Sequence, residues 1–189
     1  RFNIAISTTI TDGVVTLKAL EVSGLKKSGK FDETVPDDVT LNAGTTARWT
    51  ELLEPYTLAA NDELLVKNFT TDVDNTNDTY KQFVYQGLVI PQTAAYESIK
   101  LDGTSDEKTP YLNIQYTITT GEGASAKTQD YSYFYNLADL FNGDGSSNLA
   151  FNEGWQNNLY ITIGAAAINF DAQVYEWATQ TPEGNLAVQ

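Results

Sequence analysis

The chain has 189 residues, with 25 acidic and 11 basic side chains, so its formal net charge is −14. A charge of this sign repels nucleic-acid phosphates and anionic membrane surfaces, so neither is an expected partner. The sequence contains no cysteine and no histidine. Disulfides, thiol catalysis, serine–histidine triads and sites with cysteine or histidine metal ligands are therefore excluded.

The first half of the chain reads mainly as β-strands, because apolar residues recur at every second position. Residues 2–7, FNIAIS, form the first such segment, and residues 14–22, VVTLKALEV, form the next. The polar stretch KKSGK at 26–30 predicts a turn. Residues 46–56, TARWTELLEPY, predict one or two helical turns before Pro55.

The second half continues this pattern. Strands are predicted at KQFVYQGLVIP (81–91), PYLNIQYTIT (110–119), DYSYFYNL (130–137) and both arms of NNLYITIGAAAINFDAQVYEW (157–177). Only YNLADLF at 135–141 predicts a further helical turn. The strand-rich pattern predicts an all-β fold, an antiparallel Greek-key β-sandwich with one or two short helical turns.

The chain length fits one domain over residues 1–189, since a domain of this size buries roughly 70% of its unfolded surface. No apolar run is long enough for a transmembrane helix. The sequence lacks methionine even at position 1, so we expect that a segment was removed from the N-terminus.

Sequence motifs for chemistry are weak. Asp72, Asp74 and Asp78 alternate like ligands of a calcium loop, but the glycine and the closing glutamate of that motif are missing. The pairs Ser23-x-x-Lys26 and Ser105-x-x-Lys108 match a serine–lysine acylase pattern, but both lie in loops beside strands. We therefore expect no catalytic residue, no metal and no cofactor, and we predict that the protein is not an enzyme.

A covalent cross-link is a further hypothesis. Lys18 lies in an early strand and Asn169 in a late one, and such a pair can be joined by an isopeptide bond. The interpretation that we favour is that both are ordinary outward-facing polar residues.

Four segments, in order, resemble the fimbrillin family, the subunits of the type V pili of Bacteroidales. GVVTLKALEVSGLKKSGKF resembles a strand, glycine and basic-turn segment of the family, and GLVIPQT and PYLNIQYTIT are similar to two stretches that follow it. The closing segment GWQNNLYITIGAAAINFDAQVYEW resembles the family's C-terminal signature. Its matching positions are Trp155, Tyr160, Ile161, Ile163, Ile168, Phe170, Val174 and Trp177. Ile161 stands one place earlier than the Tyr-x-Ile spacing of the signature requires.

This resemblance implies a transthyretin-like sandwich, export as a lipoprotein, proteolytic trimming and assembly by strand exchange between subunits. It covers only the second of the family's two domains. The implied location is the cell surface, in a fimbrium at the outer membrane. The implied partners are other pilus subunits, self or related fimbrillins, and a host surface ligand is a further candidate partner.

The C-terminal tail PEGNLAVQ is a candidate donor strand, because Leu186 and Val188 alternate after a glycine. An edge strand within its own sandwich is an equally weighted interpretation.

A secreted carbohydrate- or protein-binding β-sandwich module is the competing function. Exposed aromatic side chains stack on sugar rings. The candidates for this role are Trp49, Tyr131, Tyr133, Tyr135 and Trp155. A coplanar row of exposed rings favours this alternative, and burial of the rings counts against it.

Overall fold

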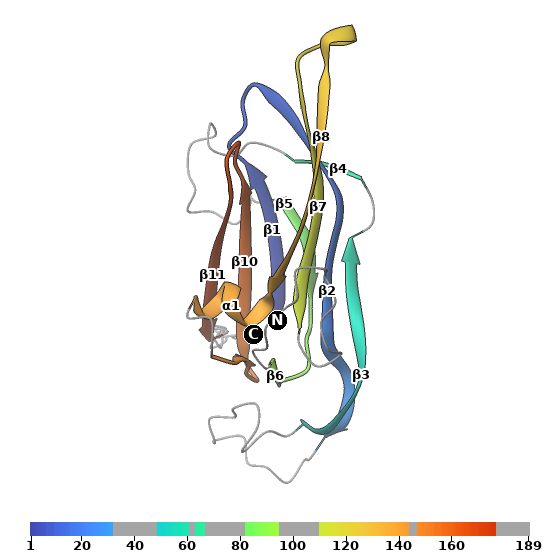
Figure 1. Cartoon of the computed structure of the whole chain (residues 1–189). Coiled ribbons are helices and arrows are strands. Elements are labelled where there is room, and N and C mark those ends of the chain that lie inside the picture. Colours follow the sequence, from blue (N-terminus) through green and yellow to red (C-terminus); the bar gives the residue numbers. More distant parts are fainter. Residues whose placement is uncertain (32–48, 61–62, 67–81, 95–109, 144–146, 177–189) are drawn as a thin grey trace, which may run out of the picture.

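The computed structural model describes residues 1–31, 49–60, 63–66, 82–94, 110–143 and 147–176. These residues form strands β1 to β11, one 3-10 turn at Gly123–Ser125 and one short helix, α1 (Leu137–Asn142) (Figure 1). The predicted all-β class is confirmed. The Greek-key connection and the single-domain organisation stay predictions.

One sheet, called sheet A here, has the strand order β11-β10-β1-β5. Its strands are β1 (Phe2–Thr8), β5 (Gln82–Gly87), β10 (Trp155–Ile163) and β11 (Ile168–Glu176). Successive side chains on a strand point to opposite faces. Phe2, Ile4 and Ile6 therefore share the face that packs against the other sheet, and each is at most 1% exposed.

The second sheet, sheet B, has the order β3-β2-β7-β8, with β4 also paired to β2. Its strands are β2 (Gly13–Phe31), β3 (Trp49–Ala60), β4 (Leu64–Val66), β7 (Tyr111–Thr120) and β8 (Lys127–Asn136). Figure 1 shows the β7–β8 hairpin projecting beyond the upper end of the other strands. A small third sheet pairs β6 (Gln92–Ala94) with β9 (Leu149–Phe151).

The two large sheets share one apolar core. Leu17, Leu20, Leu112 and Ile114 of sheet B are at most 1% exposed and belong to the same buried cluster as the inward residues of sheet A. Full burial of one such side chain stabilises the fold by roughly 1.5–3 kcal/mol. The core therefore lies between the two layers, as expected for a sandwich.

One strand pair is parallel, which differs from the predicted antiparallel arrangement. β1 pairs with β10 in parallel from Phe2 opposite Asn157 to Thr8 opposite Ile163. The other strand pairs in the described sheets are antiparallel. Short hairpins force antiparallel pairing, but most of the chain separates these two strands, so no turn constrains their relative direction.

The predicted turn at 26–30 is wrong, because these residues continue β2. Their partner is β3, which pairs with β2 from Leu20 opposite Ala60 to Phe31 opposite Trp49. The side chain of Gln92 also satisfies the backbone of Lys26, at 2.8 Å from its nitrogen and 3.0 Å from its oxygen. Gly24 has a φ of 86° at a register shift, so the glycine forms a bulge inside the strand instead of ending it.

The helical turn predicted at 46–56 is wrong for residues 49–56, which belong to β3. Pro55 lies opposite Lys26 in the register. β3 is an edge strand in the described part of sheet B, and edge strands tolerate proline because they leave one side without ladder bonds. Pairing with the long strand β2 therefore prevails over local helix preference.

The helix predicted at 135–141 is confirmed as α1. The side-chain oxygen of Asn136 accepts hydrogen bonds from the nitrogens of Ala138 at 2.9 Å and Asp139 at 3.3 Å. These bonds cap the start of the helix. At its end, Gly143 adopts a left-handed conformation with φ of 67°, which glycine tolerates best.

Candidate functional site

The candidate site is the flank between β8 and β11, the edge strands of the two sheets. In the described part of the chain, β8 pairs only with β7, and β11 pairs only with β10. The outer side of each strand therefore carries backbone N–H and C=O groups that meet no described strand. Such edges are templates for pairing with another chain.

A row of tyrosines lines the β8 side of this flank. Tyr131 lies opposite Tyr116 of β7, and their ring centroids are 4.9 Å apart with planes only 11° apart. Tyr133 stacks next to both, at 6.4 Å from Tyr131 and 6.3 Å from Tyr116. Tyr135 follows at 6.1 Å from Tyr133. Cross-strand and same-face packing therefore gathers four phenol rings into one stack, called the tyrosine stack below.

The lower end of the flank is closed. The ring of Tyr135 meets the ring of Phe170 on β11 edge-on, at a centroid distance of 4.6 Å. Helix α1 follows directly after β8 and lies against the lower part of sheet A (Figure 1). Its residues Leu137 and Ala138 are at most 1% exposed. The two sheet edges are therefore held together at this end.

The core-facing side of β11 is only partly covered. Phe170 and Ala172 are half-buried, and Val174, on the same side of the strand, is 41% exposed. The described part of sheet B ends at β8, so its cover over this face is incomplete. On the opposite edge strand, Tyr133 is 40% exposed. Apolar surface thus remains open beside two strand edges.

Burial changes the acidity of the stack. Burial first, and then the neighbouring tyrosines Tyr133, Tyr131 and Tyr135, together raise the pKa of Tyr116 to about 12. The pKa of Tyr135 is also raised, first by burial and then by Tyr133. Low solvation and nearby phenolates both disfavour the charged form. Tyr116 and Tyr135 are therefore neutral in the physiological range.

The upper end of the flank holds a cleft of about 500 Å³. Its walls come from the β1–β2 connection, the root of the β7–β8 hairpin and the β10–β11 turn. The lining residues are Ile10, Asp12, Ile118, Thr120, Lys127, Thr128, Gln129, Tyr131 and Ala165. This volume lies within the range of small-ligand pockets, roughly 300–1,000 Å³.

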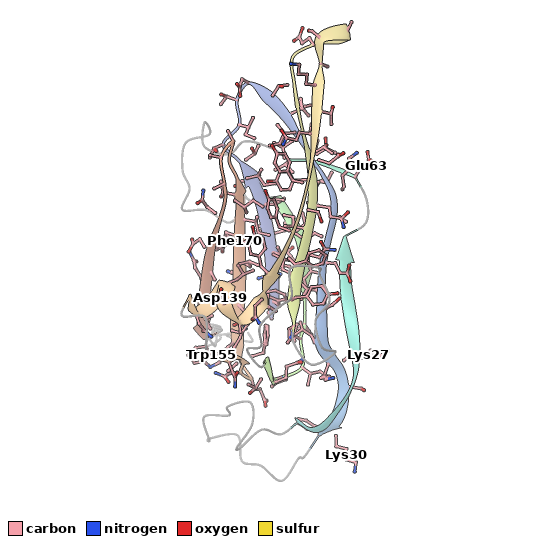
Figure 2. All side chains as sticks on the ribbon, in the orientation of Figure 1. Lys27, Lys30, Glu63, Asp139, Trp155 and Phe170 are labelled. Atoms are coloured by element: carbon pink, nitrogen blue, oxygen red, sulfur yellow. The ribbon has the colours of Figure 1, made fainter. Side chains whose placement is uncertain are left out.

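The structure brings together three of the predicted sugar-stacking residues, Tyr131, Tyr133 and Tyr135. Their rings stack on one another and do not form a coplanar row, and Tyr131 and Tyr135 are half-buried. Trp155 is half-buried at the start of β10, near the lower end of the molecule (Figure 2). Trp49 begins β3, where only the backbone is described. Sugar binding by these residues stays a prediction.

The candidate donor residues Leu186 and Val188 lie outside the described residues, as do Asp72, Asp74, Asp78, Ser105 and Lys108. The flank itself contains features that sequence reasoning did not single out. Gln129 and Lys127 lie on the same inward face of β8 as Tyr131. Their spacing of two residues in the sequence could have predicted this shared face. Asp12 lies between β1 and β2, and its proximity to the hairpin depends on the tertiary fold.

The other sequence candidates are far from this flank or lack the required geometry. Ser23 donates a hydrogen bond to Glu21 at 2.8 Å, and both lie on β2, so the Ser23–Lys26 pair is not at a helix start. Lys18 pairs with Glu63 at 2.6 Å, whereas Asn169 is exposed on β11 in the other sheet. This arrangement agrees with ordinary polar roles for Lys18 and Asn169.

The described ranges contain no cluster of three acidic side chains that could hold a metal ion. They also contain no helix long and apolar enough to cross a membrane.

Comparisons with known proteins yield structural likeness only. The chain matches no protein-family model and no curated protein. A candidate cell adhesion protein of Bacteroides uniformis aligns with 94% of this chain and 49% of its own, at 13% identity and a TM-score of 0.35. A candidate cell adhesion protein of Parabacteroides distasonis aligns with 94% of this chain and 52% of its own, at 11% identity and a TM-score of 0.44.

A fimbrial protein of Bacteroides vulgatus aligns with 93% of this chain and 53% of its own, at 13% identity and a TM-score of 0.33. The chain thus spans about half the length of the solved structures that it resembles.

Proposed function

We propose that this chain is a structural or adhesive subunit of a bacterial surface fimbria and that subunits join by β-strand exchange. One observation carries the proposal: the outer edge of β8, which pairs with no further described strand, lies beside apolar residues of β11 that the described part of sheet B leaves partly uncovered. The proposal also rests on the ordered sequence resemblance to fimbrillins. It places the protein at the cell surface, with other pilus subunits and a host surface ligand as partners.

The geometry suits an added strand. A segment that pairs with the outer edge of β8 at residues 131–135 extends sheet B by one strand. It then lies over the inner face of β11, where Val174 is 41% exposed and Phe170 is half-buried. Backbone hydrogen bonds supply affinity in such β-augmentation, and alternate side chains supply specificity.

The energy of the contact depends on its apolar anchors. Each Leu or Val side chain that becomes fully buried contributes roughly 1.5–3 kcal/mol. The tail of a neighbouring copy offers Leu186 and Val188. Two anchors leave a small surplus over the cost of ordering the tail, so further contacts from the edge pairing are needed.

Charge opposes premature contact between subunits. The net charge of −14 makes copies of this chain repel one another at low ionic strength. Asp171 and Gln173 are exposed on the opposite face of β11 and keep that face polar. We therefore expect that association is slow until an edge strand is engaged.

Disulfide trapping tests the proposal cleanly, because the chain has no cysteine. Ser132→Cys places a thiol on the outer face of β8, and Ala187→Cys places one on the tail, between the two apolar anchors. The two variants are mixed, oxidised and separated by size under denaturing conditions. Val14→Cys, at a residue 50% exposed on β2, replaces Ser132→Cys in the matched control.

A disulfide-linked dimer that forms with Ser132→Cys and not with Val14→Cys supports exchange. Equal yields contradict it. A double variant that cross-links only within one chain shows that the tail pairs with its own domain. Electron microscopy of the full-length, protease-treated protein then tests for filaments, and persistent monomers argue against a stalk subunit.

A further inference from the structure

The upper cleft differs in chemistry from the rest of the flank. The inward face of the β7–β8 hairpin begins as apolar core at Leu112 and Ile114 and continues through the tyrosine stack. Beyond the stack, the same face carries Thr120, Gln129 and Lys127, because these residues keep the two-residue period. The hairpin thus extends an aromatic surface directly into a polar one.

The polar groups around the cleft are available to a ligand. For the side chains of Asp12, Gln129 and Lys127, the structure shows no hydrogen bond or ion pair among its described residues. Asp12 contributes a carboxylate, Gln129 an amide and Lys127 an ammonium group. Together they offer both donors and acceptors, and the single positive charge offsets the single negative one.

The apolar groups of the cleft lie next to these polar ones. Tyr131 ends the tyrosine stack at the cleft, with Ile118 beside it on β7 and Ile10 across from it on the β1–β2 connection. Ala165 on the β10–β11 turn adds a small side chain. The cleft therefore combines aromatic and aliphatic side chains with hydrogen-bonding groups, and small-molecule sites contain both kinds of group.

We propose that this cleft binds the terminal residue of a neutral glycan. A pyranose ring presents apolar C–H groups, which suit the aliphatic side chains of Ile10 and Ile118, and a rim of hydroxyl groups that both donate and accept hydrogen bonds. A neutral ligand fits because the charges of Asp12 and Lys127 cancel. An anionic sugar has no excess of basic groups to bind here and is repelled by the net charge of −14.

The cleft adjoins the edge proposed for strand exchange and shares only Tyr131 with it. Glycan binding uses residues 127–131 of β8 and the two neighbouring connections, and it requires no second subunit. The two proposals can therefore fail independently.

Saturation-transfer NMR on the full chain tests the proposal. The probes are the methyl glycosides of galactose, mannose and N-acetylglucosamine, with N-acetylneuraminic acid as the anionic comparison. We expect saturable binding of at least one neutral probe, with a Kd on the order of 1 mM for a single sugar ring. Gln129→Ala and Asp12→Asn change exposed residues and leave the core intact, so the fold is expected to persist.

The expected result is a loss of affinity of about tenfold in Gln129→Ala, because this substitution removes a hydrogen bond to the sugar. Ser132→Ala, on the outer face of the same strand, is the matched control and keeps full affinity. The proposal is overturned if no neutral probe binds saturably or if N-acetylneuraminic acid binds as tightly as the neutral sugars. It is equally overturned if Gln129→Ala and Ser132→Ala bind alike.

Discussion

β1 and β11 lie on either side of β10 and carry the same alternation of apolar residues, yet they differ greatly in burial. Phe2, Ile4 and Ile6 of β1 are at most 1% exposed, whereas Val174 of β11 is 41% exposed and Phe170 is half-buried. β1 lies in the middle of sheet A, and sheet B covers its inward face. β11 lies at the edge, where the described part of sheet B ends.

This difference shows what alternation specifies and what it leaves open. It decides which side chains share a face of a strand. How deeply that face is buried depends on the neighbouring strand and on the extent of the opposite sheet. Substitutions along the two strands can therefore separate stability from association.

The largest expected effect is that of Ile4→Ala in β1. Ile4 is fully buried, so truncation removes its transfer free energy and leaves a cavity. The free energy of unfolding should fall by about 2–5 kcal/mol. Urea unfolding followed by far-UV circular dichroism measures it, and a change of less than about 1 kcal/mol contradicts the central position of β1.

Alkaline pH probes the tyrosine stack, which leads from inner strand β7 to the edge strand β8. Burial raises the pKa of Tyr116 to about 12, against about 10 in an unfolded chain. The unfolded state loses its proton first, so the free energy of unfolding is intact below pH 10 and falls between pH 10 and about 12.

The expected loss from Tyr116 is on the order of 2 kcal/mol. Unfolding at a series of pH values measures it, and Tyr116→Phe serves as the comparison because it has no ionisable proton. Identical pH profiles for the two proteins would falsify the assignment to Tyr116.

Phe170→Ala tests the closed lower end of the flank. Phe170 is half-buried and meets Tyr135 edge-on at 4.6 Å. We expect a loss of about 1–2 kcal/mol, less than for a fully buried phenylalanine. Adding Tyr135→Ala completes a double-mutant cycle, and additive losses would show that the ring contact contributes nothing by itself.

Asn136→Ala tests the helix that closes the same end. It removes the acceptor of two backbone nitrogens at the start of α1. The expected loss is about 1 kcal/mol, measured by thermal unfolding. Asn136→Ser keeps a capping oxygen, so it should restore most of the stability.

The smallest expected effect on stability is that of Val174→Ala in β11. Its side chain is 41% exposed, so the free energy of unfolding should change by less than about 0.5 kcal/mol. Strand exchange predicts that adding Val174→Ala to the Ser132→Cys variant clearly lowers the yield of its cross-linked dimer with Ala187→Cys. An unchanged dimer yield would show that Val174 does not belong to the association surface.

The strands with strict alternation were predictable from sequence. In the C-terminal hairpin, the alternation of Leu159, Ile161 and Ile163 puts them on one face of the predicted strand, and each is at most 1% exposed. The extension of β2 through KKSGK was not predictable, because its partner β3 and the side chain of Gln92 come from distant parts of the chain. For β3, local helix preference and edge-strand pairing competed, and pairing prevailed.

The site was less predictable than the fold. Tyr131, Tyr133 and Tyr135 alternate within the predicted strand at 130–137 and therefore share one side of it, and the structure places them in one stack. The contribution of Tyr116 depends on the register between β7 and β8. Asp12 and Ala165 reach the cleft only because three separate connections meet at one end of the sandwich.

The parallel pair of β1 and β10 constrains the order of events during synthesis. β1 leaves the ribosome well before its partner Trp155–Ile163, because most of this chain separates the two strands. Closing so long a loop is slow. Until β1 pairs with β10, Phe2, Ile4 and Ile6 remain exposed as an aggregation-prone apolar segment. Sheet A is therefore completed only after β10 has been made, and we expect that chaperones hold the earlier strands until then.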